Sequence, residues 1–264
     1  MSALKGKTTT LEAVLKKDRL ILISCLVAIS ILCWWYIIYL YQQMHPMNMG
    51  AFLFAMPMTA KWSVTDFALL FLMWFIMMIA MMTASVAPLI LIFAMVNRQK
   101  QQQQNPYVSA GYLFAGYYFV WAIFSLLATL LQWLLQQLNW LNPDMVITYK
   151  ILSAVILILA GIFQFTGLKQ RCLLHCQTPV DFIHSKWKTG RAGAFKMGVE
   201  NGIFCLGCCW ILMAVLFVAG IMNLLWIALI GIFVLIEKIM PRSKWISYAA
   251  GTGLIVYGVI IFFK

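Results

Sequence analysis

Long uncharged apolar runs alternate with short polar segments along the whole chain of 264 residues. A helix that crosses the hydrocarbon core of a bilayer needs ~20 predominantly apolar residues, and most of these runs reach that length. The pattern therefore predicts an all-α polytopic transmembrane helical bundle of about seven spans. The expected spans cover residues 20–41, 67–96, 107–138, 146–168, 198–219, 224–236 and 245–263.

Three polar segments before or between these runs have a distinct composition. Residues 1–19 are basic, residues 42–65 are rich in methionine, and residues 169–197 are basic. The first apolar run is long and aromatic and lacks the cleavage site of a signal peptide, so we expect it to be retained as a span. Because no segment is long enough for a separate soluble domain, we expect one membrane domain over residues 1–264.

The positions of the basic residues predict how the chain is oriented in the membrane. With seven spans and a cytoplasmic N-terminus, 16 of the 19 Lys and Arg residues fall on the cytoplasmic side. Cytoplasmic loops carry an excess of Lys and Arg, so the asymmetry indicates an inside N-terminus and an outside C-terminus. Residues 1–19 and 169–197 are then cytoplasmic, and residues 42–65 are external. We expect the bacterial cytoplasmic (inner) membrane.

Composition excludes the main alternatives to a membrane protein. Hydrophobic residues make up 64% of the chain and charged residues only 10%, whereas about 25% of a typical soluble domain is charged. Such a chain has too little polar surface to be soluble and too many apolar residues to be disordered. The net charge of +12 is explained by the cytoplasmic segments. The expected partner is therefore the lipid bilayer and no nucleic acid.

Three cysteines lie close together within the fifth expected span. Cys205, Cys208 and Cys209 are three and four residues apart, so a helix places all three on one face. Thiolates are soft ligands that favour Cu(I), zinc or iron–sulfur clusters. The alternative is that these are small buried residues that pack helices together. The clustering of three thiols on one face favours a metal site.

A second group of candidate ligands opens the long cytoplasmic segment. Cys172, His175 and Cys176 offer two thiols and an imidazole near the membrane surface, and a helix would place the two thiols on one face. The cytoplasm keeps such thiols reduced. The alternatives are a pair of interfacial cysteines without a special role, or juxtamembrane acylation.

Methionines supply softer candidate ligands in two places. In the second expected span they recur at helical spacing, and in the external segment they surround a histidine and a proline. Thioethers suit a soft monovalent ion such as Cu(I). The alternatives are core packing in the span and an amphipathic interfacial helix in the external segment. The candidate ligands are Met77, Met78, Met81 and Met82 in the span and Met44, His45, Met47 and Met49 in the external segment.

Few ionisable residues lie near the expected spans. Acidic residues inside a membrane are functional candidates by default. Glu200 and Glu237 fall near the inner interface, however, where a Glu–Lys pair such as Glu237 with Lys238 costs little. We expect both acids to be structural. Asp66 is expected to cap the start of the second span.

These stretches together resemble a family of integral membrane proteins for which metal binding has been predicted. The resemblance covers roughly residues 68–245 and rests on the Met-rich second span, the CLxxC segment at 172–176 and the CxGCCW block at 205–210. It implies metal handling by a membrane bundle and no enzymatic activity. Family members often carry His before the glycine that matches Gly202, and this chain has Asn201 there. Because Asn is a poor ligand for a soft ion, the thiols would carry more of the binding.

The candidate ligands form a graded row of soft groups across the expected bilayer. It runs from the external methionines, through the methionines of the second span and the thiols of the fifth, to the cytoplasmic thiols. Several weak, exchangeable sites suit an ion that must both enter and leave. The sequence therefore predicts a copper-handling membrane protein that binds and moves Cu(I), with zinc as the alternative metal and no catalytic residues.

Two other functions remain open. The first is an accessory or structural subunit of a membrane cuproenzyme, or a factor that loads its metal, for which a cytoplasmic metal acceptor is another partner. The second and less favoured is a thiol–disulfide oxidoreductase that uses Cys205 and Cys208. These two thiols lie inside a span, away from any protein substrate at the outer surface, which argues against exchange chemistry.

Overall fold

The computed structural model describes residues 2–44, 63–101, 108–142, 146–221, 223–240 and 244–263, with the backbone alone for residues 2–18, 43, 44 and 101. These residues form ten helices, and no strand occurs among them apart from one isolated bridge between Leu141 and Ile147. The expected all-α fold is confirmed. The helices are α1 (Ser2–Met44), α2 (Val64–Gln101), α3 (Ala110–Gln137), α4 (Lys150–Gln164), α5 (Gly167–Gln177), α6 (Pro179–Lys186), α7 (Gly190–Ala214), α8 (Leu216–Ala219), α9 (Leu224–Ile239) and α10 (Lys244–Phe263).

Five helical segments are long and apolar enough to cross a membrane. The pair α4 and α5 passes the same test jointly but is bent by 62°, which gives up to six candidates. The helix α9 covers the sixth expected span with 16 residues, or ~24 Å at 1.5 Å per residue. The five segments are Arg19–Gln42, Val64–Lys100, Ala110–Gln137, Gly190–Ala219 and Lys244–Phe263.

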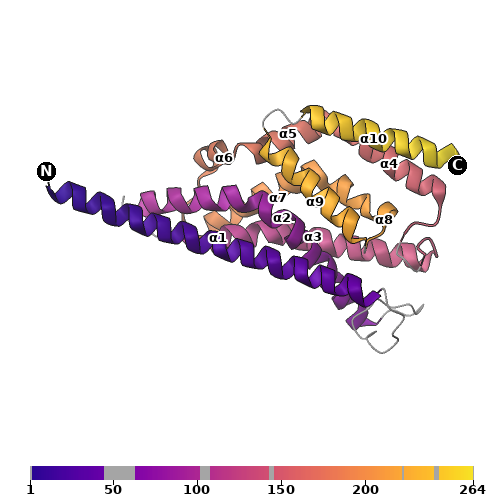
Figure 1. Cartoon of the computed structure of the whole chain (residues 1–264), viewed down its shortest axis with the longest axis horizontal. Helices are drawn as coiled ribbons and strands as arrows, with labels where there is room; N and C mark the ends of the chain where they lie inside the picture. Colours follow the sequence, from indigo (N-terminus) through magenta and orange to yellow (C-terminus); the bar gives the residue numbers. More distant parts are fainter. Residues whose placement is uncertain are drawn as a thin grey trace.

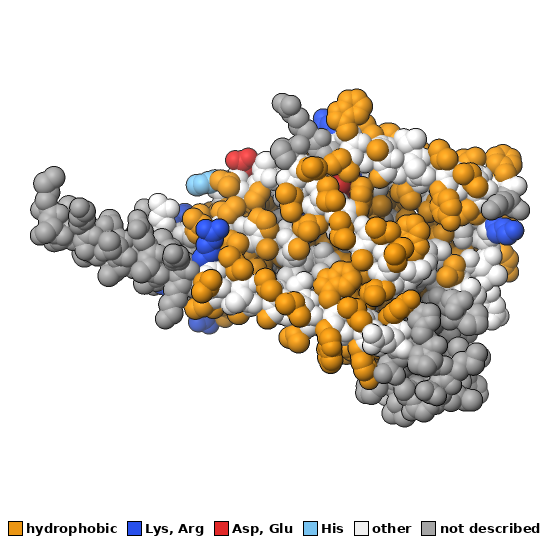
Figure 2. Space-filling model, in the orientation of Figure 1, with side chains coloured by type: hydrophobic (Ala, Val, Ile, Leu, Met, Phe, Trp, Pro, Cys, Tyr) orange, Lys and Arg blue, Asp and Glu red, His pale blue; other side chains and the backbone are white. Residues whose placement is uncertain are grey.

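The outer surface of the bundle is apolar, as an integral membrane protein requires. Large side chains such as Leu32, Trp35 and Ile151 are each more than 60% exposed. Figure 2 shows hydrophobic side chains spread over the visible face, with the basic side chains gathered mostly toward one end. An apolar surface of this extent is not found on soluble monomers. This surface is therefore suited to contact with the lipid bilayer.

The fourth expected span ends earlier than the apolar run does. The helix α4 ends at Gln164, and Thr166 caps the start of α5 by accepting a hydrogen bond from the backbone N–H of Lys169. Because α5 turns away at this point, Cys172 and Cys176 lie against the bundle. The segment 169–197, expected as a basic loop, holds most of α5, all of α6 and the start of α7.

Contacts between glycines and backbone bring α7 to the centre of the bundle (Figure 1). A Cβ at Gly198 in α7 would overlap the carbonyl oxygen of Leu113 in α3, and a Cβ at Gly116 in α3 would overlap that of Phe195 in α7. The two helices can approach this closely only because no side chain intervenes. The cysteines of α7 consequently face α3 on one side and α2, α5 and α9 on the others.

Candidate metal centre

Cys205 lies at the centre of the candidate site. Its side chain is 1% exposed, and its sulfur is 2.9 Å from the hydroxyl oxygen of Tyr117 on α3 and 2.9 Å from the Nζ atom of Lys238 on α9. An ammonium group can only donate hydrogen bonds, so the Cys205 sulfur accepts from Lys238. A thiol sulfur and an ammonium group from distant parts of the chain therefore meet away from solvent.

The other two cysteines of α7 point to the same side of the helix, as their spacing predicts. The thiols of Cys208 and Cys209 each donate to the carbonyl oxygen of Cys205 at 3.0 Å. Both side chains are buried. Such bonds to the preceding turn hold the thiols against their own helix, which fixes the positions of their sulfur atoms beside Cys205.

The thiols of α5 join those of α7. The Cys176 side chain lies near the thiols of Cys205 and Cys208 and lines the same small cavity as Cys205. The Cys172 sulfur packs against Gly207, where a Cβ would come within 3.0 Å of it. The two cysteine groups, expected separately from the sequence, therefore form one cluster across two helices.

His175 has a different environment from the neighbouring cysteines. Its ring stacks on Phe204 with 4.0 Å between the ring centroids and meets Phe182 edge-on. The imidazole is thus engaged in aromatic packing between α5, α6 and α7. In this conformation it is not directed at the thiols.

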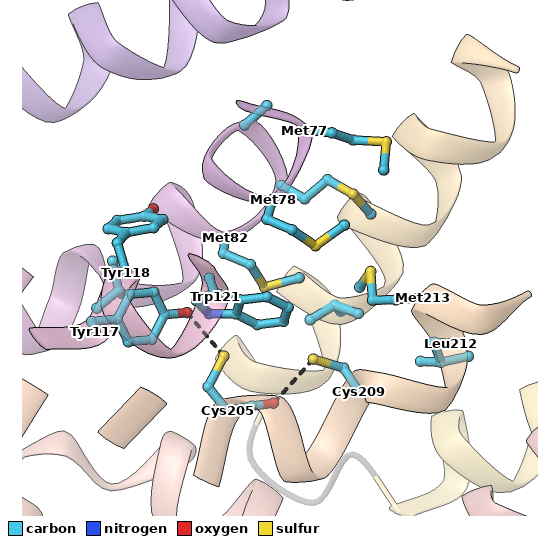
Figure 3. Close-up of a cluster of buried hydrophobic side chains, with 14 of the residues drawn as sticks. Met77, Met78, Met82, Tyr117, Tyr118, Trp121, Cys205, Cys209, Leu212 and Met213 are labelled. Atoms are coloured by element: carbon cyan, nitrogen blue, oxygen red, sulfur yellow. Dashed lines mark hydrogen bonds between the residues drawn. The ribbon is translucent and has the colours of Figure 1, made fainter. Parts of the chain in front are cut away.

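The methionines of α2 approach the cluster from above in Figure 3. The picture shows Met77, Met78 and Met82 in a row that ends beside the thiols of α7. Met82 is the methionine that reaches the site, because its Sδ atom lies 4.0 Å from the Nζ of Lys238. Met81 instead packs toward Gly231 on α9. All four methionines are buried.

A small cavity adjoins the cluster. Its volume is about 20 Å³, which is enough for one water-sized species. The hydroxyl oxygen of Ser85, on the cavity wall, is buried and has no hydrogen-bond partner among the described residues. Asn201, which occupies the position where the sequence departs from the family it resembles, lines the same cavity. The lining side chains include Ser85, Tyr117, Cys176, Asn201, Cys205 and Lys238.

Glu237 does not pair with its neighbour Lys238. Glu237 is 2% exposed and pairs with Lys169 on α5 at 2.6 Å, while its other neighbour is the hydroxyl of Ser247 at 2.5 Å. Lys238 points to Cys205 instead. Consecutive residues of a helix point about 100° apart, so the two charges reach different neighbours. Lys169, expected in a cytoplasmic loop, is fully buried and also donates to Gln164.

Glu200, expected to be structural, and Asp66, expected to cap the second span, both have structural partners. Glu200 pairs with Lys188 near the start of α7, and both side chains are partly exposed. Asp66 accepts a hydrogen bond from the backbone N–H of Ser63 at 2.8 Å, which caps the first turn of α2. Neither carboxylate takes part in the sulfur cluster.

The described residues contain no group of three or more His, Cys, Asp or Glu side chains already arranged to hold a metal ion. The sulfur donors nearest one another in this region are the Cys205 and Cys176 thiols and the Met82 thioether, and the Lys238 ammonium contacts the sulfurs of Cys205 and Met82. The external ligand candidates His45, Met47 and Met49 and the Met44 side chain lie outside the described residues.

Sequence reasoning missed three residues of this site. Lys238, Tyr117 and Ser85 surround Cys205 and its cavity. Lys238 is the one that a sequence signal marked, because a lysine that ends an apolar run must either reach the interface or find a buried partner. The tyrosine and the serine carry no such signal.

Comparison with known proteins agrees with the expected copper handling. The sequence model of the PpoB2 family, described as a copper chaperone, matches residues 71–261. This is more than two thirds of the chain and includes most of α2, all of α3 to α9 and most of α10, with Met82, Cys176 and Cys205 among the matched residues. No curated protein and no solved structure matches the chain. The chain therefore belongs to the PpoB2 family of copper chaperones, and its role is to handle copper rather than to catalyse a reaction.

Proposed function

We propose that this protein binds Cu(I) as cargo at the Cys205 sulfur, with Met82 and Cys176 as further ligands, and passes the ion to an acceptor. The observation that carries the proposal is that sulfurs of α7 and α2, Cys205 and Met82, both approach the buried Lys238 ammonium, while Cys176 of α5 lines the same small cavity as Cys205. Thiolate and thioether sulfur favour Cu(I) over harder divalent ions. Cys208, Cys209 and Cys172 lie close enough to serve as exchange ligands during transfer.

A route for the ion leads along α2. Met77 and Met78 precede Met82 in the row of thioethers that ends beside the thiols of α7 (Figure 3). Neutral thioethers bind less firmly than thiolates, and movement requires sites that are weak enough to leave. Copper entering along this row would therefore collect at Cys205. The same row favours transport across the membrane as a second candidate function.

We infer that the protein spans the bacterial cytoplasmic membrane seven times, with its N-terminus inside and its C-terminus outside. The count includes the bent pair α4–α5 and the short helix α9. The start of α1 and the end of α10 lie at opposite ends of the bundle (Figure 1), which an odd number of crossings requires. The basic residues support this orientation through the positive-inside rule.

The acceptor follows from the position of the site. Cys172 and Cys176 lie on α5, at the start of the segment 169–197 that is expected on the cytoplasmic side. Both side chains are partly exposed. Stepwise exchange from Cys205 to these thiols would bring copper toward a soluble metal acceptor. Lateral contact with a membrane cuproenzyme is the other delivery route. The site supports loading of a metalloenzyme through either route.

The test is anaerobic Cu(I) binding by the purified full-length protein in detergent. We expect one tightly bound Cu(I) in the wild type and its loss in Cys205→Ser. Cys25→Ser is the matched control, because Cys25 is an exposed cysteine on α1. Equal copper content in all three proteins, with folding intact, would show that the cysteines of the cluster pack helices together and do not bind copper. A parallel binding measurement with Zn(II) tests the alternative metal.

A further inference from the structure

We propose that Lys238 is a built-in occupant of the copper site, and that its ammonium group is displaced from Cys205 into the adjoining cavity when Cu(I) binds. The inference rests on the proposed function of the sulfur cluster. It assigns to Lys238 a positioning and regulatory role in copper binding and release. Lys238 is not a ligand of the metal in this scheme.

The position of the ammonium group is the first argument. The Nζ atom of Lys238 lies 2.9 Å from the Cys205 sulfur and 4.0 Å from the Met82 sulfur. A copper ion held by the same two sulfurs would need the space that this group fills. One monovalent cation must therefore exchange for another. Two cations side by side in a medium of low dielectric constant would also repel each other strongly.

The cavity provides the second argument. It borders Lys238 itself and has a volume of about 20 Å³, which is comparable to the space one water molecule needs. The Ser85 hydroxyl oxygen on its wall lacks a hydrogen-bond partner among the described residues. Buried polar atoms without a partner are uncommon in folded proteins and call for an explanation. An ammonium group that rotates into the cavity would donate to Ser85 and lie beside Asn201.

The neighbouring carboxylate of Glu237 is already engaged and does not compete for the Lys238 ammonium. Glu237 already holds Lys169 at 2.6 Å and accepts from Ser247. Its carboxylate is directed toward α5 and α10 and away from the sulfur cluster. The cavity with Ser85 borders Lys238 and offers its ammonium group a polar destination.

The exchange gives a chaperone a means of release. When an acceptor removes Cu(I), the ammonium group returns to the Cys205 thiolate that the ion leaves, so the negative charge on the sulfur is paired again. Competition from a tethered cation weakens binding without removing a ligand. A carrier needs this balance because an ion bound too tightly cannot be handed on.

The experiment compares Cu(I) affinities in detergent under anaerobic conditions, with a chromogenic Cu(I) chelator as competitor. Lys238→Leu removes the tethered cation without adding a ligand, and Lys244→Leu is the control because Lys244 is exposed at the start of α10. We expect Lys238→Leu to bind Cu(I) about tenfold more tightly than the wild type and to release it more slowly to the chelator. The control should match the wild type. Unchanged or weaker binding by Lys238→Leu would overturn the inference.

A second, milder variant keeps the proposal testable if Lys238→Leu fails to fold. Ser85→Ala removes only the hydroxyl group proposed to receive the ammonium, and we expect it to weaken Cu(I) binding a few-fold. In the Lys238→Leu background the same substitution should have no effect, because no ammonium group remains to be received. Ser153→Ala, a buried serine of α4 outside the cavity, is the control. An equal effect of Ser85→Ala in both backgrounds would contradict the proposal.

The Cys205→Ser variant separates the two proposals in this experiment. Copper binding by the wild type that is lost in Cys205→Ser supports the metal site, whatever Lys238→Leu does. If the wild type itself binds no Cu(I), the proposed function fails and the displacement fails with it. If the wild type binds and Lys238→Leu binds no more tightly, only the displacement fails.

Discussion

The ammonium nitrogen of Lys238 lies 2.9 Å from the sulfur of Cys205, although 33 positions separate the two residues in the sequence. The contact joins α9 to α7 inside a bundle whose outer surface is apolar. A charge so placed needs partners that offset its loss of water. Cys205 is that partner, and the contact marks the point where the candidate copper ligands meet.

Replacing Met82 by Leu should weaken Cu(I) binding about tenfold while leaving the fold intact. Leu and Met have similar volumes, so such a change in a core usually costs less than about 1.5 kcal/mol of stability. The loss of the thioether, whose sulfur lies 4.0 Å from the Lys238 ammonium, removes a proposed ligand. Competitive titration with a Cu(I) chelator measures the affinity. Met81→Leu is the control because Met81 packs toward Gly231, and an equal loss in both variants would argue against a specific role for Met82.

Binding of Cu(I) should stabilise the protein in a way that depends on Cys205. A ligand that binds only the folded state at 100 times its dissociation constant adds about 2.7 kcal/mol. We expect the thermal unfolding midpoint in detergent to rise when Cu(I) is added to the wild type and to Cys25→Ser. Cys205→Ser should show no rise. A rise of the same size in Cys205→Ser would place the copper elsewhere.

The Glu237→Gln variant should lower the free energy of unfolding by about 3 kcal/mol, because it leaves the Lys169 ammonium buried without a charged partner. Both side chains of this pair are almost completely buried, with Lys169 at 0% and Glu237 at 2% exposure. The comparison is Glu200→Gln, whose partner Lys188 is partly exposed. Pairs near water contribute about 0–1 kcal/mol. Unfolding in mixed detergent micelles measures both variants, and equal losses would contradict the assignment of the buried pair.

Alanine at Gly198 should separate α7 from α3 and destabilise the bundle by roughly 1–3 kcal/mol, the usual cost of overpacking. Its Cβ would overlap the carbonyl oxygen of Leu113. Gly253 on α10 is the matched control, since a Cβ there meets nothing within 4 Å. Alanine in an exposed part of a helix is ordinarily favoured over glycine by about 0.5–1 kcal/mol. A similar loss of stability for both variants would mean that the close approach of α3 and α7 is not needed.

Much of the fold was predictable from the sequence because membrane helices are specified locally. Each predicted apolar run overlaps a helix, and the spacing of Cys205, Cys208 and Cys209 correctly placed the three thiols on one face. The bend after Gln164 was not predictable in the same way. The apolar run continues through it, and the break depends on how Thr166 caps α5.

The site was predictable only in part. The sequence indicated both cysteine groups and the methionines of α2, because sulfur ligands at helical spacing carry a recognisable chemical signal. It did not indicate that His175 stacks on Phe204 or that Lys238 reaches Cys205. Both side chains found their neighbours through contacts between helices that are distant in the sequence.

The sequence by itself specified a chain of long apolar helices suited to a membrane and carrying candidate soft metal ligands. In a bilayer every backbone polar group must be satisfied within its own segment, so an apolar run of sufficient length already specifies a helix. The tertiary structure alone decided which of the sulfur atoms meet and what lies between them. That choice depends on which helices pack together, through close contacts such as Gly198 against Leu113, and on where a buried charge such as Lys238 finds a partner.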